Sequence, residues 1–78
     1  MIIVYVLQST ITDKYYKGMC QNMDTRLKEH NQGKTKSTKS GIPWKVVYTE
    51  EHPNREEARK REKYFNSAAG RRFLNTIL

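Results

Sequence analysis

The run IIVYVLQ, residues 2–8, is the most apolar stretch of the chain, and its length and β-branched side chains are typical of a β-strand. Because side chains alternate between the two faces of a strand, the run divides into two apolar sets: Ile3, Tyr5 and Leu7, and Ile2, Val4 and Val6. A strand that is apolar on both faces must be covered on both. Residues 2–8 are therefore predicted to form the central strand of a sheet.

A second strand and a helix are expected next. A polar turn at residues 9–13 leads into a short strand at residues 14–18, and so short a connection predicts an antiparallel hairpin. Asn22 is a favourable N-cap residue for a helix that runs from Met23 to about residue 32. Gly33 suits the position just past the helix end, where the left-handed conformation costs glycine little.

The middle of the chain combines a basic segment with a third strand. Residues 34–41 (KTKSTKSG) show no periodicity, which predicts a mobile basic loop. Pro43 is acceptable at the start of a strand, and residues 44–48 follow it. The alternation expected for that strand places these side chains on one face, with Trp44 in the core: Trp44, Val46 and Tyr48.

Two helices complete the predicted fold. Asn54 and Glu57 have the spacing of a capping box before a helix at residues 55–66, and Ser67 is placed to cap a last short helix. The order is β-β-α-β-α-α. We expect an α/β (α+β) fold in which helices flank a small, mostly antiparallel three-stranded sheet, and in which residues 1–78 form a single domain.

Charge favours a nucleic-acid partner. Fifteen lysines and arginines against eight aspartates and glutamates give a formal net charge of +7 and a pI near 9.8. Such a domain can neutralise backbone phosphates, although excess lysine can also serve solubility alone. No apolar run of about 18 residues is present, so no membrane-spanning helix is expected. No signal peptide is visible and Cys20 is the single cysteine, which favours a reducing cytoplasmic location.

Five polar residues are candidates for one site: Tyr5, Tyr16, Arg26, His30 and Glu62. Arg26 and His30 are four residues apart and share one face of the predicted helix. An arginine stabilises charge on a phosphate, and a histidine can move a proton near neutral pH. Each residue also has a simpler reading, because a tyrosine in a strand can be a core aromatic and a charged helix face can be merely solvated.

Glu62 is unusual for its position. It falls within a stripe of helical spacing that is otherwise apolar, formed by Ala58, Phe65 and Ala69. A carboxylate in such a stripe needs a partner, because burying it unpaired is costly. That partner is either one of the many basic residues or a divalent cation, since Mg²⁺ is commonly held by one or two carboxylates together with water and substrate phosphates.

Taken in order, these segments resemble the GIY-YIG nuclease superfamily, and most of all its small single-domain branch related to the nuclease domain of the bacterial excision-repair endonuclease. The resemblance covers nearly the whole chain and rests on five segments: Val4-Tyr5-Val6, Tyr16-Lys17-Gly18, QNMDTRLKEHN (residues 21–31), PWKVVY (residues 43–48) and EARKREKY (residues 57–64). No one segment is specific. Five in this order and spacing are a strong signal.

The resemblance implies a role for each of the five residues. Tyr5 and Tyr16 would be paired active-site tyrosines, one of them helping to activate water. Arg26 would contact the scissile phosphate and His30 would assist proton transfer. Glu62 would be the only protein carboxylate on a Mg²⁺ or Mn²⁺ ion. A late polar residue would join them, for which Asn66 and Asn75 are the candidates.

The basic residues expected to bind nucleic acid lie outside this set: Lys17, Lys34, Lys36, Lys39, Arg71 and Arg72. The leading hypothesis is a metal-dependent endonuclease that hydrolyses phosphodiester bonds in DNA, whether branched, damaged or single-stranded. The alternative is a nucleic-acid-binding module of the same fold with weak or no turnover. A third reading is a basic face that docks an acidic protein. Specificity would come from DNA shape, a protein partner or a homodimer.

Overall fold

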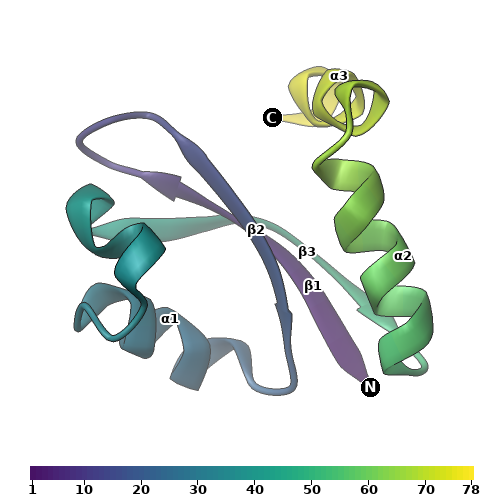
Figure 1. Ribbon diagram of the computed structural model, residues 1–78, viewed down its shortest axis with the longest axis horizontal. Coiled ribbons are helices and arrows are strands. Elements are labelled where there is room, and N and C mark those ends of the chain that lie inside the picture. Colours follow the sequence, from purple (N-terminus) through teal and green to yellow (C-terminus); the bar gives the residue numbers. More distant parts are fainter.

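Strand β1 (Ile2–Ser9) is the middle strand of a three-stranded antiparallel sheet in the computed structural model, which describes all 78 residues. Strand β2 (Tyr15–Cys20) pairs with one side of β1, and strand β3 (Trp44–His52) pairs with the other. The strand order β2-β1-β3 confirms the predicted central strand and leaves β2 at a free edge of the sheet (Figure 1).

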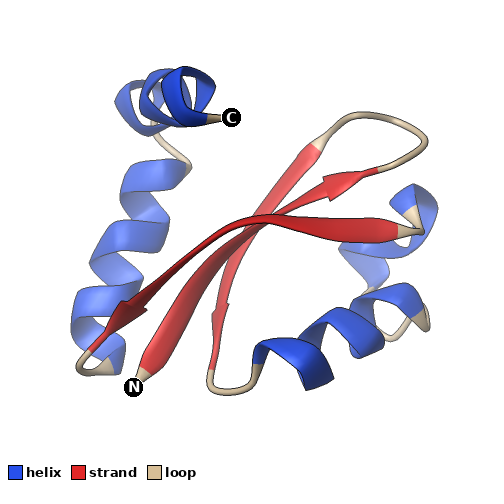
Figure 2. Cartoon of the chain, turned by 180° about the vertical axis from the view of Figure 1, so that it is seen from behind, coloured by secondary structure: helices blue, strands red, loops and turns tan.

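Helices cover both faces of this sheet. Helix α1 (Met23–Asn31) and a short 3-10 helix, η1 (Lys36–Gly41), lie on one side, and helices α2 (Arg55–Phe65) and α3 (Ala68–Ile77) lie on the other (Figures 1 and 2). None of them has the length and apolar character that crossing a bilayer would require. The predicted element order and fold class are confirmed, with η1 added between α1 and β3.

Two apolar clusters back the two faces of β1, as the alternation of its residues predicts. On the α2–α3 side, Val4 and Val6 pack with Phe65, and on the α1 side, Tyr5 packs with Trp44. Trp44 is buried, which confirms its predicted place in the core. The fold therefore depends on one strand that contributes to both clusters.

The predicted helix boundaries are confirmed by their caps. Each N-cap side chain accepts a hydrogen bond from the backbone N–H three residues later, at 3.1 Å for Asn22, 2.9 Å for Asn54 and 3.1 Å for Ser67. Such a bond satisfies one of the N–H groups that a helix start leaves without a partner. Gly33, just past α1, has a φ of 78°, the left-handed conformation expected there.

The expected alternation along β3 is wrong beyond Val46. The register shifts between Val6 and Leu7, because Val6 pairs with Tyr48 while Leu7 pairs with Val46. The extra residue of this bulge moves Tyr48 to the α2–α3 cluster, whereas Val46 remains in the α1 cluster. A period of two cannot continue through a bulge.

The prediction of a mobile loop at residues 34–41 is also wrong. Residues 36–41 form η1, and Thr38 within it is fully buried. The Trp44 indole Nε1–H donates to the Thr38 carbonyl at 2.7 Å, and Ser9 Oγ donates to the Gly41 carbonyl at 2.6 Å. Buried polar groups need such partners, and they fix a segment that has no apolar periodicity of its own.

Ala69 does not belong to the inward stripe proposed for it. Helix α2 ends at Phe65, and the chain turns before α3 begins at Ala68. The turn leaves Ala69 exposed and buries Gly70 against the end of α2 instead. The stripe on α2 therefore comprises Ala58 and Phe65, with Glu62 at its margin.

Candidate active site

Tyr5, Arg26 and His30 meet on the α1 side of the sheet. The Tyr5 hydroxyl lies 2.9 Å from His30 Nε2, and Arg26 Nε donates to the same hydroxyl at 3.4 Å. Tyr5 and His30 are both fully buried, whereas Arg26 is partly exposed. The i, i+4 spacing on α1 therefore places an arginine and a histidine around one phenol oxygen.

Gly18 makes room for this phenol. It lies opposite Tyr5 in the β1–β2 register, and a Cβ atom at position 18 would lie 2.5 Å from the Tyr5 hydroxyl oxygen. No side chain larger than hydrogen fits there without moving the ring. Glycine two residues after Tyr16 is thus required by the close approach of the Tyr5 ring to the β2 backbone.

Thr38 fixes the position of the proton on His30. Thr38 Oγ1 donates to the Thr35 carbonyl at 3.2 Å and lies 2.9 Å from His30 Nδ1. With its proton donated to Thr35, the Thr38 oxygen accepts from Nδ1–H, which leaves Nε2 to accept the Tyr5 proton. The opposite tautomer would leave the Tyr5 proton without an acceptor, so full hydrogen-bond satisfaction selects Nδ1–H.

In this cluster, Tyr5 and His30 are uncharged and Arg26 carries the positive charge. Burial raises the pKa of Tyr5 to about 12, although the Arg26 guanidinium acts in the opposite direction. Burial, reinforced by the positive charge of Arg26, lowers the pKa of His30 below 6.5. At neutral pH, Tyr5 is therefore a phenol and His30 an uncharged imidazole, as their shared hydrogen bond requires.

Tyr16 joins the cluster through its ring. The ring centroid lies 5.1 Å from that of His30 and 6.4 Å from that of Tyr5. The Tyr16 hydroxyl has no hydrogen-bond partner in the protein. It is not a buried atom, because His52 Nε2 is the one buried side-chain nitrogen or oxygen without a partner. The Tyr16 hydroxyl is therefore open to solvent, unlike that of Tyr5.

Glu62 stands apart from these four residues. It lies on α2, on the other side of the sheet, half-buried and without a hydrogen bond to the cluster. Its carboxylate has no ion-pair partner, so none of the many basic residues neutralises it: the four ion pairs of the protein use Glu29, Glu50 and Glu57.

The donor set suits a weakly chelated cation. No group of three or more His, Cys, Asp or Glu side chains occurs in the chain, so a site made of protein ligands alone is absent. A lone, unpaired carboxylate matches the way Mg²⁺ is held when water and substrate phosphates complete its shell. Asn66 donates to the Glu62 backbone carbonyl at 3.2 Å, and Asn75 is exposed on α3, so neither candidate asparagine contacts the cluster.

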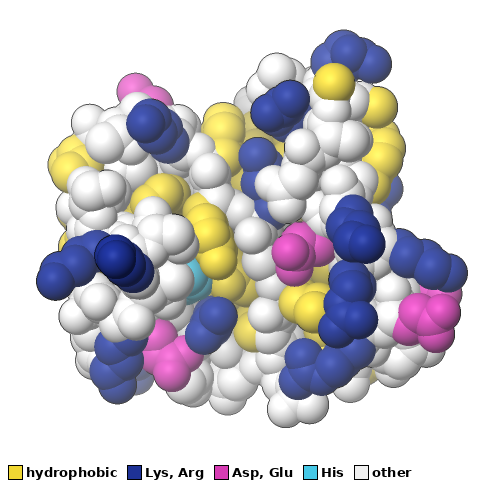
Figure 3. Space-filling view, viewed as in Figure 1, with side chains coloured by type: hydrophobic (Ala, Val, Ile, Leu, Met, Phe, Trp, Pro, Cys, Tyr) yellow, Lys and Arg dark blue, Asp and Glu magenta, His cyan; other side chains and the backbone are white.

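The basic residues predicted to bind nucleic acid are distributed over both helical layers. Lys34, Lys36 and Lys39 are exposed beside α1, and Arg71 and Arg72 are exposed on α3. The molecule has two lobes, one around α1 and η1 and the other around α2 and α3. Lysine and arginine side chains lie on both lobes, on either side of a depression that contains apolar side chains (Figure 3).

Lys17 differs from the other basic residues because it is half-buried. It alternates with Tyr16 on β2 and therefore points to the α2–α3 face of the sheet. Burial and, to a smaller extent, the positive charge of Arg71 lower its pKa. Lys17 and Arg71 thus form a basic pair on the face opposite the tyrosines.

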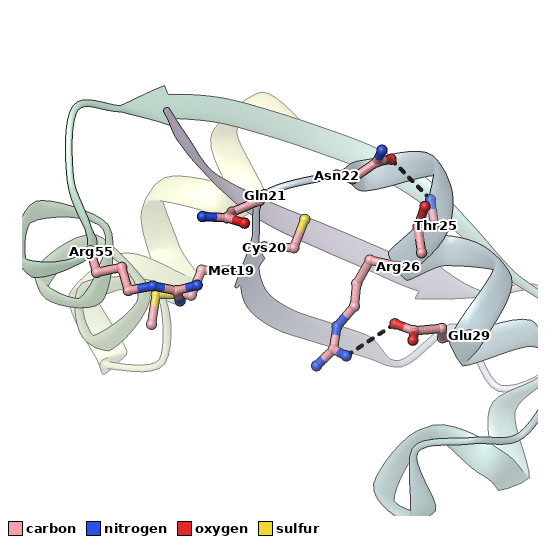
Figure 4. Close-up of a pocket in the computed structure, with 8 residues that line it drawn as sticks. All are labelled: Met19, Cys20, Gln21, Asn22, Thr25, Arg26, Glu29 and Arg55. Carbon is pink, nitrogen blue, oxygen red and sulfur yellow. Dashed lines mark hydrogen bonds and ion pairs between the residues drawn. The ribbon is translucent and has the colours of Figure 1, made fainter.

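A pocket of about 340 Å³ opens beside the cluster, at the free edge of β2 (Figure 4). It is lined by the end of β2, the turn after it, one face of α1 and the first residue of α2: Met19, Cys20, Gln21, Asn22, Thr25, Arg26, Glu29 and Arg55. Arg26 belongs both to this pocket and to the tyrosine cluster.

Sequence reasoning missed two of the polar residues at this site, Thr38 and Arg55. A signal for the first existed, because a buried tryptophan needs an acceptor for its indole N–H, and the segment just before Trp44 is the nearest source of one. No local pattern marks Arg55, whose place in the pocket depends on how α2 packs against the sheet.

Comparison with known proteins identifies the class of domain to which this fold and this cluster belong. Residues 1–75 match the GIY-YIG catalytic domain, so the chain belongs to the GIY-YIG family and has a nuclease-type fold.

Two curated relatives are both named UPF0213 proteins. The chain is 35% identical over 75 residues to UPF0213 protein CPE1444 of Clostridium perfringens, which covers 95% of this chain and 80% of that protein. It is 41% identical over 51 residues to UPF0213 protein BLi00048/BL00536 of Bacillus licheniformis, which covers 64% of this chain and 53% of that protein. Neither name states an activity. No solved structure matches the chain significantly.

Proposed function

We propose that this protein is a metal-dependent endonuclease that hydrolyses phosphodiester bonds in DNA. The observation that carries the proposal is the convergence of Tyr5, Arg26 and His30 around one buried phenol, beside a Tyr16 hydroxyl that is free to meet a substrate. Membership of the GIY-YIG family and the formal charge of +7 support the same conclusion.

Arg26 would bind the scissile phosphate. Its Nε donates to Tyr5 and one terminal nitrogen donates to Glu29 at 3.3 Å, which leaves its second terminal nitrogen free. A guanidinium held on two sides presents its remaining N–H groups in a fixed direction. Such a donor is suited to the charge that develops on a phosphate during attack by water.

The two tyrosines would then divide the work. Tyr16 has a partly exposed ring and an unengaged hydroxyl, so it would accept a hydrogen bond from the attacking water and orient it. Tyr5 is fully buried and its pKa is near 12, so it would act by holding Arg26. His30 lies behind Tyr5 and would hold the phenol in the orientation that leaves its oxygen available to Arg26.

Glu62 would hold Mg²⁺ or Mn²⁺ together with water and substrate oxygens, in keeping with its unpaired carboxylate. When bound, the cation supplies charge neutralisation on a phosphate oxygen. The basic residues that would bind the DNA backbone are those predicted from the sequence: Lys17, Lys34, Lys36, Lys39, Arg71 and Arg72. A cytoplasmic location and kinship with the nuclease domain of the excision-repair endonuclease belong to the same proposal.

Nicking of DNA in the presence of Mg²⁺ or Mn²⁺ tests this function. The panel comprises duplex, branched and single-stranded substrates, with EDTA as the blank. Arg26→Gln is expected to lower the rate by about 100-fold, the scale for loss of one transition-state donor. Lys28→Gln removes the same charge from an exposed site on α1 and is expected to leave the rate unchanged.

The metal assignment has its own matched pair. Glu62→Gln is expected to abolish metal-dependent nicking, whereas Glu56→Gln, on an exposed position of the same helix, is expected to retain it. If the wild-type protein nicks no member of the panel, the endonuclease proposal is wrong for those substrates. Equal rates for wild type and Arg26→Gln would remove the site assignment.

One observation favours a binding module without turnover. Glu29 forms an ion pair with Arg26 and accepts a hydrogen bond from one of its terminal nitrogens, so part of the guanidinium is already engaged. A protein that binds DNA in a salt-sensitive manner, keeps that binding in Glu62→Ala and never nicks would match this second function. Binding that ignores salt would exclude it.

A further inference from the structure

The pocket at the free edge of β2 brings together two arginines from different helical layers. Arg26 lines the pocket from α1 and Arg55 from the first position of α2, and Figure 4 shows Arg55 beside Met19 at one end and Arg26, turned toward Glu29, at the other. Arg26 and Arg55 are 29 positions apart in the chain. Their presence in one pocket is therefore a property of the tertiary fold.

The charge of this pocket is uncompensated. Glu29 pairs with Arg26, but Arg55 takes part in none of the ion pairs of the protein and makes no side-chain hydrogen bond. Burial raises the pKa of the Cys20 thiol, so this thiol adds no negative charge at neutral pH. Two guanidinium groups against one carboxylate leave a net charge of +1 in the pocket.

The uncharged lining supplies further donors. Asn22 uses its amide oxygen to cap α1, and its amide nitrogen has no partner. Gln21 is exposed at the same rim and makes no hydrogen bond with its side chain. A pocket with free guanidinium and amide N–H groups, and with a volume near the lower end of the range for small ligands, suits a phosphate ester.

The pocket adjoins the proposed active site through Arg26, and its other arginine stands on the same helix as Glu62. Arg26 also donates to Tyr5, so an anion in the pocket would lie beside the phosphate that Arg26 binds for cleavage. Arg55, Arg59 and Glu62 follow one another at helical spacing and so share one face of α2. Glu62 therefore lies about 10 Å further along the helix axis from Arg55, at 1.5 Å per residue.

We propose that this pocket is a subsite for a nucleic-acid backbone phosphate next to the scissile one, and that Arg55 is its principal contact. The proposal rests on the proposed function for the position of the scissile phosphate. The subsite lets a strand cross the free edge of β2 between the two helical layers, from the tyrosine cluster toward Glu62. Its ligand is a phosphate diester of a DNA strand.

Salt-dependent binding tests the subsite separately from hydrolysis. The full chain is titrated with a fluorescently labelled single-stranded oligonucleotide in EDTA, and anisotropy gives the affinity at several salt concentrations. Arg55→Gln is expected to reduce the slope of log K against log salt by about one, the loss of one phosphate contact. Lys60→Gln removes the same charge from the outward face of α2, where the side chain is 67% exposed, and is expected to retain the wild-type slope.

The subsite would be overturned by an unchanged salt slope in Arg55→Gln or by an equal loss of slope in Lys60→Gln. It would also be overturned if inorganic phosphate displaced the oligonucleotide at the concentration at which phosphate itself binds, because the ligand would then be free phosphate. Matching thermal melts of the two variants and the wild type establish that both are folded. If Arg55→Gln loses the slope while the wild type never nicks, the subsite holds and hydrolysis fails. If the wild type nicks and Arg55→Gln binds normally, only the subsite is wrong.

Discussion

The Thr38→Val substitution tests the hydrogen-bond chain that orders the candidate active site. Valine has nearly the shape of threonine but cannot accept the His30 Nδ1–H, which now lies 2.9 Å from Thr38 Oγ1 in a fully buried environment. A buried donor left without an acceptor costs about 1–3 kcal/mol. In a domain of this size, each kcal/mol lowers Tm by about 4–8 °C.

The substitution also affects the position of Arg26. Without an acceptor for Nδ1–H, the Nδ1–H tautomer of His30 loses the hydrogen bond that favours it, so a larger fraction of the molecules carries the proton on Nε2. Nε2–H would then point at the Tyr5 oxygen, and the Tyr5 proton would lose its acceptor. We therefore expect Thr38→Val to slow nicking as well as to lower stability, because Tyr5 would no longer hold the Arg26 guanidinium in one orientation.

Circular dichroism melts and the nicking assay measure the two effects. Thr38→Ser keeps the hydroxyl and is expected to restore most of both. Thr35→Val makes the same change three residues earlier, where the side chain has no hydrogen bond, and serves as the control. A Thr38→Val protein that melts with the wild type and nicks at its rate would refute the tautomer assignment.

Two further predictions concern the same cluster. Gly18→Ala would place a Cβ atom 2.5 Å from the Tyr5 hydroxyl oxygen. We expect this overpacking to lower the free energy of unfolding by about 1–3 kcal/mol, which urea unfolding would measure. A stability equal to that of the wild type would show that the Tyr5 ring moves freely. Because burial and Arg26 lower the pKa of His30, the unfolded chain binds more protons than the folded one below pH 6.5. The contribution of His30 to the free energy of unfolding should then be constant well above pH 6.5 and should fall as the pH drops toward the pKa of the folded state. An NMR titration of the imidazole that gives a His30 pKa at or above 6.5 would contradict this prediction.

Local patterns were enough to predict most elements of this fold. The apolar alternation of residues 2–8 predicted the central strand, and asparagine or serine at the helix starts predicted boundaries that the observed caps confirm. Each of these features depends on neighbours within a few residues. The errors at Tyr48 and Ala69 have the opposite origin, since a bulge and a break between two helices are determined by contacts with distant strands and helices.

The candidate site divides in the same way. The spacing of Arg26 and His30 on one helix placed them on a common face, and the structure brings both to the Tyr5 hydroxyl. Thr38 was assigned to a mobile loop, because its order comes from His30, Trp44 and Thr35 and not from any periodicity of its own. A residue whose position is fixed only by polar partners elsewhere in the chain leaves no signature in a local window.

The burial of Tyr5 separates the roles of the two tyrosines. Removing the proton from a phenol with a pKa near 12 at neutral pH costs roughly 1.4 kcal/mol for each unit of difference, which disfavours Tyr5 as a base. The same burial excludes water from its hydrogen bonds with His30 and Arg26, and so strengthens them. A buried phenol that gains nothing as a base can still hold a guanidinium in place, provided that a second hydroxyl meets the water. Tyr16 offers that hydroxyl on the exposed side of the cluster, so the proposed mechanism divides between two tyrosines a role that would require one tyrosine to be both buried and accessible.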